Sequence, residues 1–226
     1  LETGIKMLPI SVTMFITAAL GARLSSRFSI RAIVRTGLAS VSGGVLLLLS
    51  AVEPTLNGAG FDVAMAVLGA GMGLIASQLG NVVQSSVDAS GRSEAGGLQF
   101  TGQQLGSSLG IALIGAIVLS SLTNVFLSTV EEDERLSSEV TEQVGVAVGA
   151  GIDFVTSDQI EAAAQDAGLD EASSDALVED YETAQLQSLR LGLLAAALLV
   201  LVGVPSTAYL PHSLGPRGAG PSATVH

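Results

Sequence analysis

The side chains best suited to bind a solute lie within two long stretches of sequence that carry no charge. Gln78 and Asn81 stand three residues apart near the end of one stretch, and Gln103 stands near the start of the next. An amide donates and accepts hydrogen bonds but does not titrate, so its chemistry is recognition. Unpaired amides are costly in an apolar medium, so they must face a watery cavity or bond to a neighbouring helix. We take Gln78, Asn81 and Gln103 as candidates for lining a substrate cavity, with interhelical bonding as the alternative.

Small residues recur every four positions in the same two stretches. They are Gly69, Gly73 and Ser77 in the first stretch and Gly102, Gly106 and Gly110 in the second. Positions four apart share one face of a helix, and helices in lipid pack closely through such small-residue faces. The spacing therefore predicts two packed helix interfaces, although glycine is also frequent in membrane helices in general.

The residue types give little support to catalysis. The chain has no cysteine, and its two histidines, His212 and His226, both follow Leu210. Residues 71–76 match a dinucleotide-binding pattern, but that pattern works only where a strand turns into a helix. We expect no enzymatic activity, no catalytic residue, no metal site and no cofactor. Nucleic acid is not expected as a partner of a chain whose net charge is -12.

Five stretches without Asp, Glu, Lys or Arg must position these groups. They cover residues 7–22, 36–52, 63–87, 95–130 and 191–216. A helix needs about 20 mostly apolar residues to cross the hydrocarbon core of a bilayer. Three stretches exceed that length, and each of the two shorter ones has a flanking base that can extend to the membrane interface. A soluble helix would show a polar face, and residues 33–52 and 189–210 show almost none.

The sequence therefore predicts an all-α, polytopic membrane helix bundle. Four transmembrane helices are expected within residues 1–122, at about 5–22, 33–52, 63–85 and 98–122. An acidic extracytoplasmic loop with short helices follows over 123–188, and the last transmembrane helix is expected at 189–210. Residues 211–226 are expected to form a disordered cytoplasmic tail.

Charge is distributed unevenly along the chain. Sixteen of the 21 acidic residues and a single base, Arg135, lie within 123–188. Arg23, Arg27, Arg31 and Arg35 all lie between the first two uncharged stretches, 7–22 and 36–52. Because bases favour cytoplasmic loops, this link is predicted inside. Alternation then places the N-terminal end and the acidic segment outside, in a multi-pass protein of the cytoplasmic membrane.

The acidic segment carries signals for short helices. Thr156 followed by Gln159 is a capping-box pattern, and Gly168 is a suitable helix stop. The acids could attract cationic ligands, or they could form a solvated face whose field is screened beyond about 8 Å. We favour the solvated face.

Several runs of sequence resemble one family of transporters. They are GARLSSRFSIR at 21–31, LGAGMG at 68–73, NVVQSS at 81–86, GGL at 96–98 and QLGSSLGIA at 104–112. These runs resemble the 14-helix drug/proton antiporters of the major facilitator superfamily, of the EmrB/QacA type. The resemblance covers residues 4–210 and corresponds to the last five helices of that family.

The run at 21–31 resembles the cytoplasmic loop motif of the superfamily. Gly21, Arg23, Arg27 and Arg31 stand at its positions, whereas serines replace an acid and a glycine that the motif usually has. Gln103 stands where the family commonly has a base. Roles that depend on those replaced groups are therefore not carried over to this chain.

The resemblance implies the C-terminal fragment of a secondary active transporter that exports drugs or other small molecules in exchange for protons. The expected partners are the missing N-terminal half, the lipid bilayer, protons, and small hydrophobic or cationic substrates. The expected spans contain no Asp, Glu or His, so the proton-coupling acid is expected in the missing half. The chain also starts at Leu1 without a basic leader, as the later part of a longer protein would.

A membrane-anchored sensor or interaction protein is the alternative function. It would use the acidic loop as its recognition domain and the spans as its anchor. The two glycine repeats and the amides within the spans favour transport, since a plain anchor does not require them.

Overall fold

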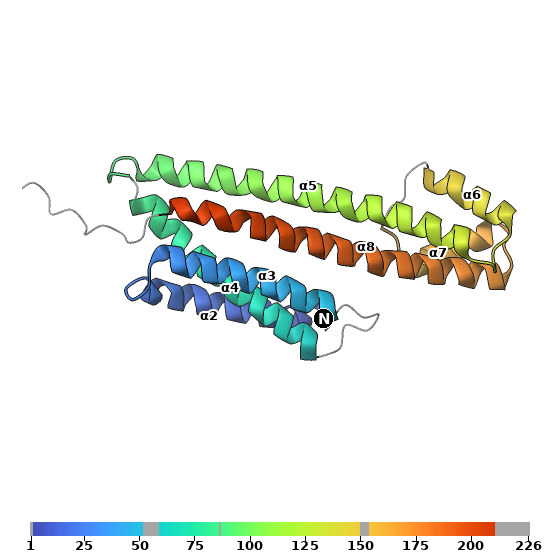
Figure 1. Ribbon diagram of the computed structural model, residues 1–226, viewed down its shortest axis with the longest axis horizontal. Helices are drawn as coiled ribbons and strands as arrows, with labels where there is room; N and C mark the ends of the chain where they lie inside the picture. The colour runs from blue at the N-terminus through green and yellow to red at the C-terminus, as the bar shows by residue number, and fades with distance from the viewer. Residues whose placement is uncertain (1, 52–58, 86, 150–153, 211–226) are drawn as a thin grey trace, which may run out of the picture. The chain divides into compact units, whose positions relative to one another are not determined.

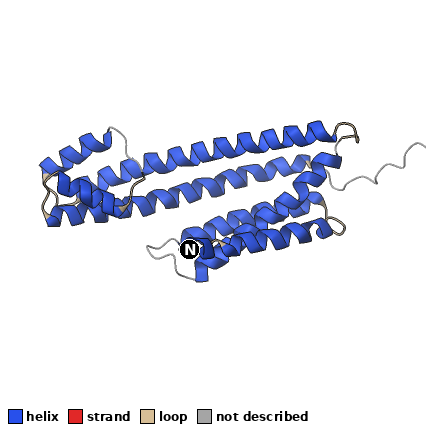
Figure 2. Ribbon diagram, turned by 180° about the vertical axis from the view of Figure 1, so that it is seen from behind, coloured by secondary structure: helices blue, strands red, loops and turns tan. Residues whose placement is uncertain are grey.

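All regular elements in the part of the chain that the structure describes are helices (Figures 1 and 2). The structure is a computed structural model that describes residues 2–51, 59–85, 87–149 and 154–210. Its elements are α1 (Glu2–Lys6), α2 (Leu8–Leu24), α3 (Ile30–Ala51), α4 (Ala59–Ser85), α5 (Arg92–Glu132), α6 (Ser138–Gly149), α7 (Ser157–Asp166), α8 (Glu171–Ser206) and a final 3-10 turn, η1 (Thr207–Tyr209). The predicted all-α class is confirmed, and the expected tail at 211–226 lies outside the described residues.

Five helical segments are long and apolar enough to cross a membrane, and they correspond to α1–α2, α3, α4, α5 and α8. The helices α5 and α8 contain 41 and 36 residues. At 1.5 Å per residue they are about 60 and 54 Å long, whereas the hydrocarbon core of a bilayer is about 30 Å thick. Each of these two helices therefore has an apolar part that can span a bilayer and a polar part that continues beyond it.

The described helices belong to two compact units. The first contains α1 to α4, the part of α5 up to Ser107 and the part of α8 from Ala197 onward. The second contains the remainder of α5 and α8 together with α6 and α7.

In the first unit α4 packs against both α2 and α3 (Figure 1). The buried side chains there include Ile30, Ile33, Phe61 and Met65. Large apolar side chains such as Phe15 point away from the unit and are exposed. Exposed apolar surface on this scale is stable against lipid, which does not exclude hydrocarbon as water does.

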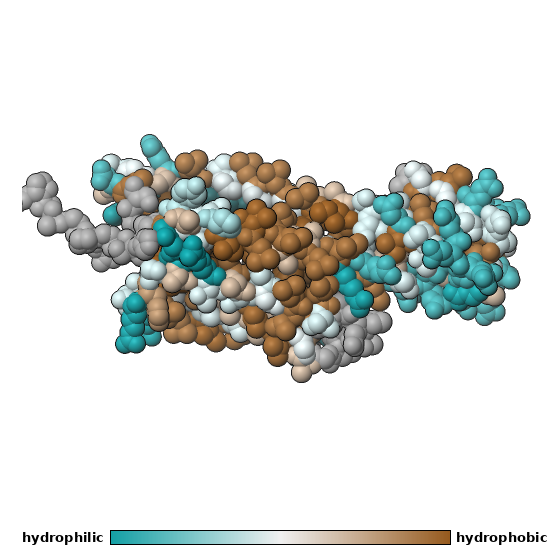
Figure 3. Space-filling model, in the orientation of Figure 1, coloured by the Kyte–Doolittle hydropathy of each residue, from teal (hydrophilic) through white to brown (hydrophobic). Residues whose placement is uncertain are grey.

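The second unit has a hydrophobic core of its own. Its fully buried members include Leu122 and Phe126 of α5 and Tyr181 of α8. The rings of Phe126 and Tyr181 meet edge to face, with centroids 5.5 Å apart. The Tyr181 hydroxyl accepts a hydrogen bond from the backbone N–H of Val155 at 2.9 Å, which ties the segment before α7 to the core. In this unit Figure 3 shows a hydrophilic surface over α6 and α7 and a hydrophobic one along the neighbouring α5 and α8.

Local signals fix both ends of α7. The Gln159 side chain reaches back to accept a hydrogen bond from the backbone N–H of Thr156 at 3.0 Å, as in a capping box. At the other end Gly168 has φ +78°, a conformation that glycine adopts without steric cost. The N–H groups of Gly168 and Leu169 then bond to carbonyls of the last helical turn, which completes a Schellman motif.

Candidate functional site

A close helix contact in the first unit lies between α2 and one small-residue face of α4. A methyl group added at Gly69 would collide with the backbone oxygen of Ile10, and one added at Gly73 would collide with that of Met14. The helices therefore approach backbone to backbone, which only small residues permit. The Gly69 and Gly73 positions singled out in the sequence thus lie at the α2 interface.

A second face of α4 lies equally close to α3. A Cβ atom built at Gly71 would stand 2.6 Å from the backbone oxygen of Gly37, and one built at Gly44 would stand 2.8 Å from the backbone nitrogen of Leu68. Our sequence reasoning did not select these glycines. The seven-residue spacing of Gly37 and Gly44, which returns to one helix face, is the signal that could have found them.

Gln78 lies at the end of the α2–α4 contact and joins the two helices. Its side chain is only 1% exposed. Its Nε2 atom donates to the backbone oxygen of Gly21 at 2.9 Å and approaches the Ser77 hydroxyl oxygen at 3.0 Å. Gly21 itself has no room for a side chain, because Ser77 occupies that space. Gln78, Ser77 and Gly21 therefore form one polar contact inside an apolar interface.

The oxygen atom of the Gln78 amide is in an unusual environment. The Oε1 atom of Gln78 is buried and has no hydrogen-bond partner among the described residues. A buried amide oxygen without a partner costs free energy, about 1–3 kcal/mol. Such a group is able to accept a hydrogen bond from a donor that enters the helix bundle.

The remaining cavity candidates are placed differently. The backbone of Asn81 continues α4 three residues after Gln78, and its side chain lies outside the described residues. Gln103 lies on α5 and is exposed. No described atom lies within 4 Å of a Cβ built at Gly102, Gly106 or Gly110, so the repeat on α5 has no partner within the described chain. The structure thus groups Gln78 with Gly69, Gly73 and Ser77, and it does not bring the α5 candidates to them.

Two arginines of α3 hold the end of the last helix. The Nη2 atom of Arg31 donates to the backbone oxygens of Ala208 and Leu210, at 2.5 and 2.7 Å. The Nε atom of Arg35 donates to the hydroxyl of Thr207 at 2.8 Å. Carbonyls at a helix C-terminus lack intrahelical donors and carry partial negative charge, so guanidinium groups stabilise them.

The other members of the cytoplasmic loop motif lie elsewhere. Arg23 ends α2, Arg27 follows in the turn before α3, and both are exposed. Of the four motif residues, Gly21 contacts α4, and Arg31 contacts η1 and the residue that follows it. Arg35, which the motif does not include, joins Arg31 in that contact.

Among the described residues, the ionisable groups whose pKa is clearly shifted lie in the second unit. Arg135 pairs with Asp133 at 2.6 Å and with Glu179 at 2.8 Å, and its hydrogen bonds lower the pKa of Asp133. Asp180 precedes the uncharged part of α8 and is only 4% exposed. Burial and then the neighbouring charge of Asp133 raise the pKa of Asp180 to about 6. Its Oδ2 atom has no hydrogen-bond partner among the described residues.

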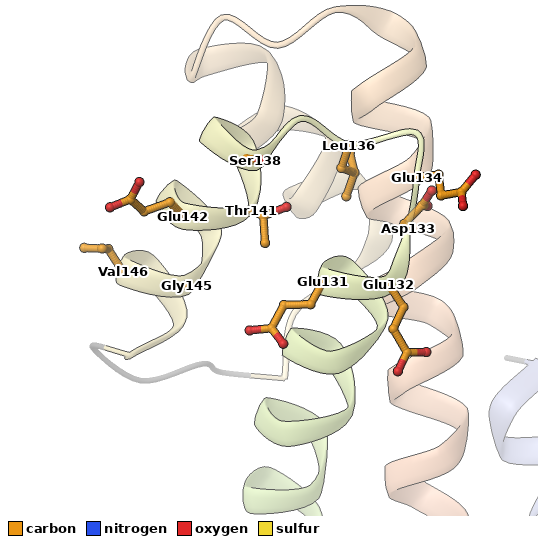
Figure 4. Close-up of a pocket in the computed structure, with 10 residues that line it drawn as sticks. All are labelled: Glu131, Glu132, Asp133, Glu134, Leu136, Ser138, Thr141, Glu142, Gly145 and Val146. Atoms are coloured by element: carbon orange, nitrogen blue, oxygen red, sulfur yellow. The ribbon is translucent and has the colours of Figure 1, made fainter.

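An acidic hollow of about 580 Å³ lies between the end of α5 and one side of α6. Figure 4 shows its carboxylates pointing in different directions, with Glu131 and Glu142 to one side and Glu134 to the other. Within the described ranges no group of three or more His, Cys, Asp or Glu side chains is arranged to hold a metal ion. The hollow is therefore an acidic surface rather than a chelating site.

Comparison with known proteins identifies two transporters that share part of this sequence. The multidrug transporter protein MdtP of Bacillus subtilis is 31% identical over 120 residues, which cover 52% of this chain and 21% of the relative. The probable actinorhodin transporter of Streptomyces coelicolor is 30% identical over 135 residues, which cover 58% of this chain and 23% of the relative. The matched regions thus span about a fifth to a quarter of each relative. No family model and no solved structure matches the chain.

The five apolar helices and the two similar proteins both point to a protein that is inserted in a membrane. Helices of this length and composition are suited to a bilayer, and both relatives are named as transporters. The chain is a multi-pass membrane protein that is related to transporters.

Proposed function

We propose that this chain is part of a proton-coupled efflux transporter of the major facilitator superfamily, of the EmrB/QacA type. It supplies five helices of the C-terminal half and exports small hydrophobic or cationic molecules across the cytoplasmic membrane. Its N-terminal end is outside and the end after α8 is inside. The observation that carries the proposal is the α2–α4 contact, in which glycines bring two backbones together around the buried amide of Gln78.

This contact suits a helix that changes its position during transport. Faces made of small residues are smooth and let one helix shift along another without large side chains interlocking. The unpartnered Oε1 of Gln78 gains a hydrogen-bond donor when a substrate or water enters the bundle. Gln78 and Asn81 are thus assigned to the substrate cavity, and Gln103 is assigned to the same cavity from α5.

Arg31 and Arg35 are assigned to the inner end of the bundle. They hold η1 and Leu210, which follow α8, against the start of α3 through three hydrogen bonds. Breaking and remaking such a contact is one way for a transporter to open on one side at a time. The loop motif residues Gly21, Arg23, Arg27 and Arg31 therefore belong to the gating surface.

Proton coupling requires a group that titrates within the cavity. The five expected spans contain no Asp, Glu or His, so we assign that group to helices of the N-terminal half. That half, the lipid bilayer, protons and the exported molecule are the proposed partners of the chain. Neither enzymatic activity nor a cofactor is part of the proposal.

The test is accumulation of a fluorescent cation, ethidium, in cells that express the complete protein containing this chain. We expect ethidium to accumulate less in these cells than in cells without the protein. A protonophore should abolish the difference, because it removes the proton gradient. If accumulation is equal with and without the protein, over a panel that also includes neutral and hydrophobic drugs, the proposal fails.

A sensor or interaction protein is the second candidate, and one observation favours it. The second unit, which the proposed orientation places outside the membrane and which we call the outer unit, has its own hydrophobic core. A simple connecting loop does not need such a core. If the protein is a sensor, altering the outer unit should cause a signalling defect and leave ethidium accumulation normal. If the protein is a transporter, the same alteration should change ethidium export.

A further inference from the structure

An apolar hollow of about 530 Å³ lies between α6 and α7 on the outer unit. Its floor is made of core residues, among them Phe126, Val148 and Leu177, each of which is nearly fully buried. Half-buried side chains, including Val144 and Ile160, form its walls. Pockets for small organic molecules are usually apolar, have volumes of about 300–1,000 Å³ and rest on packed structure. The hollow has the size, the lining and the support of such a pocket.

Among the residues that the structure describes, two amides supply the polar groups of this hollow, and none of the lining side chains is charged. Gln159 uses its Oε1 atom to hold the start of α7, so that side chain is fixed in place. Gln143 has no hydrogen-bond partner among the described residues and is free to bond to a ligand. A few placed polar groups within an apolar lining favour a mostly apolar ligand with a defined orientation.

The surroundings of the hollow select for positive charge. Glu142 precedes Gln143 on α6, and Glu161 follows Ile160 on α7. The opposite side of α6 borders the acidic hollow that contains Glu142 (Figure 4). The unit that holds the hollow is strongly negative, since residues 123–188 contain 16 acids and one base, and its field favours a cation over an anion.

No nearby base compensates for these acids. Arg135 is the single base in residues 123–188, and it is held by Asp133 and Glu179. An apolar cation gains from both the lining and the field, whereas an apolar anion of the same shape gains only from the lining.

We propose that the hollow between α6 and α7 is a binding site for small apolar cations on the outer surface of the protein. The site is separate from the proposed transport cavity, since all of its residues belong to the outer unit. Its existence does not depend on transport, so a binding experiment can fail or succeed independently of an export experiment.

The test uses two ions of equal shape and opposite charge, tetraphenylphosphonium and tetraphenylborate. Because the chain contains no cysteine, a single introduced thiol reports on its own position. Ala163→Cys places the thiol in the lining of the hollow, and Ala162→Cys places it next to that position but outside the lining. Both alanines are exposed residues of α7, so the variants are matched. The full chain is reconstituted in phosphatidylcholine nanodiscs, and the rate of labelling by N-ethylmaleimide is measured.

We expect tetraphenylphosphonium to slow the labelling of the Ala163→Cys variant severalfold and to leave the Ala162→Cys variant unaffected. Tetraphenylborate should need about a tenfold higher free concentration, measured with an ion-selective electrode, for the same protection. Adding Glu142→Gln and Glu161→Gln should weaken protection by the cation. Adding Asp62→Asn and Glu94→Gln, which removes two acids elsewhere, should not.

Three results would overturn the proposal. No protection of the Ala163→Cys variant means that the hollow binds neither ion. Equal protection at both positions means that the ions adsorb to the surface in general. Equal protection by the two ions at equal free concentration means that the hollow accepts apolar molecules without regard to charge. Its ligand would then be a neutral compound or an apolar peptide.

Discussion

The Nε2 atom of Gln78 on α4 donates a hydrogen bond to the backbone oxygen of Gly21 on α2, at 2.9 Å. The two residues are 57 positions apart in the sequence, and the bond lies in an interface where a side chain at Gly21 would not fit. Gln78 therefore has a packing role on one side of its amide and an unused acceptor on the other. These two roles can be separated by substitution.

Gln78→Leu keeps the size of the side chain and removes both the donor and the acceptor. The lost interhelical bond should reduce stability by about 0.5–2 kcal/mol, as for other polar contacts in membranes. Export of ethidium should fall by more than the amount of protein in the membrane falls, because the acceptor for substrate or water is also lost. Gln103→Leu, at an exposed position, is the control for stability. Export by the Gln78→Leu variant in proportion to its membrane level would leave Gln78 with a packing role only.

Gly73→Ala should weaken the α2–α4 contact. The added methyl group collides with the α2 backbone, and a collision of this kind costs about 1–3 kcal/mol. Gly80→Ala is a matched control on the same helix, since no atom of the described chain lies within 4 Å of that position. It should leave the midpoint of thermal unfolding equal or slightly higher, because alanine favours helix more than glycine does. Equal midpoints for the two variants would contradict the close contact.

Arg31→Gln should loosen the end of the last helix. It removes the guanidinium that bonds to the oxygens of Ala208 and Leu210. Hydrogen exchange of the backbone amides in 207–210 should become faster, and export should decline at equal expression. Arg92→Gln removes the same charge at an exposed position outside the loop motif, so it serves as the control. The gating assignment fails if both variants exchange and export alike.

Asp180 should make the second unit more stable at mildly acidic pH. Its pKa is raised from 3.8 to about 6, so the folded state holds the proton more tightly than the unfolded state. The resulting stabilisation is complete below pH 4 and is lost as the pH rises through 6. Asp133 has a lowered pKa and acts in the opposite direction, so the comparison must isolate Asp180.

Asp180→Asn provides that comparison. In the parent chain, residues 171–184 should gain hydrogen-exchange protection as the pH falls from 7 to 4.5, and the variant should lack this gain. At pH 7 the variant should be more stable than the parent chain. The exposed Glu171→Gln is the control. A pH dependence of protection that is the same in the parent chain and in Asp180→Asn would contradict the assignment.

The fold class could be predicted because the relevant pattern is local. Five uncharged stretches predicted five apolar helices, which the structure confirms. The helix expected at 98–122 was too short, because α5 begins at Arg92 and continues as a single helix to Glu132. Helix α6 was also not located in advance, because Ser137 caps its start through the N–H of Val140 but Val140 stands where Gln159 completes the capping-box pattern of α7.

The site was less predictable because it depends on which helices become neighbours. The spacing of Gly69, Gly73 and Ser77 indicated a packed face, but it did not identify α2 as the partner. The bonds from Arg31 to Ala208 and Leu210 join residues more than 170 positions apart, and no local pattern contains that pairing. The packing expected for Gly102, Gly106 and Gly110 stays a prediction.

The most direct test of the central claim is exchange of ethidium for protons by the purified complete protein in liposomes. With an acidic interior and a neutral exterior, ethidium should accumulate inside the liposomes, and an ethidium gradient should in turn move protons in the opposite direction. Both fluxes should be reduced in Gly73→Ala and kept in Gly80→Ala. Ethidium movement that is unaffected by the pH gradient, together with no proton movement in response to ethidium, would contradict proton-coupled export.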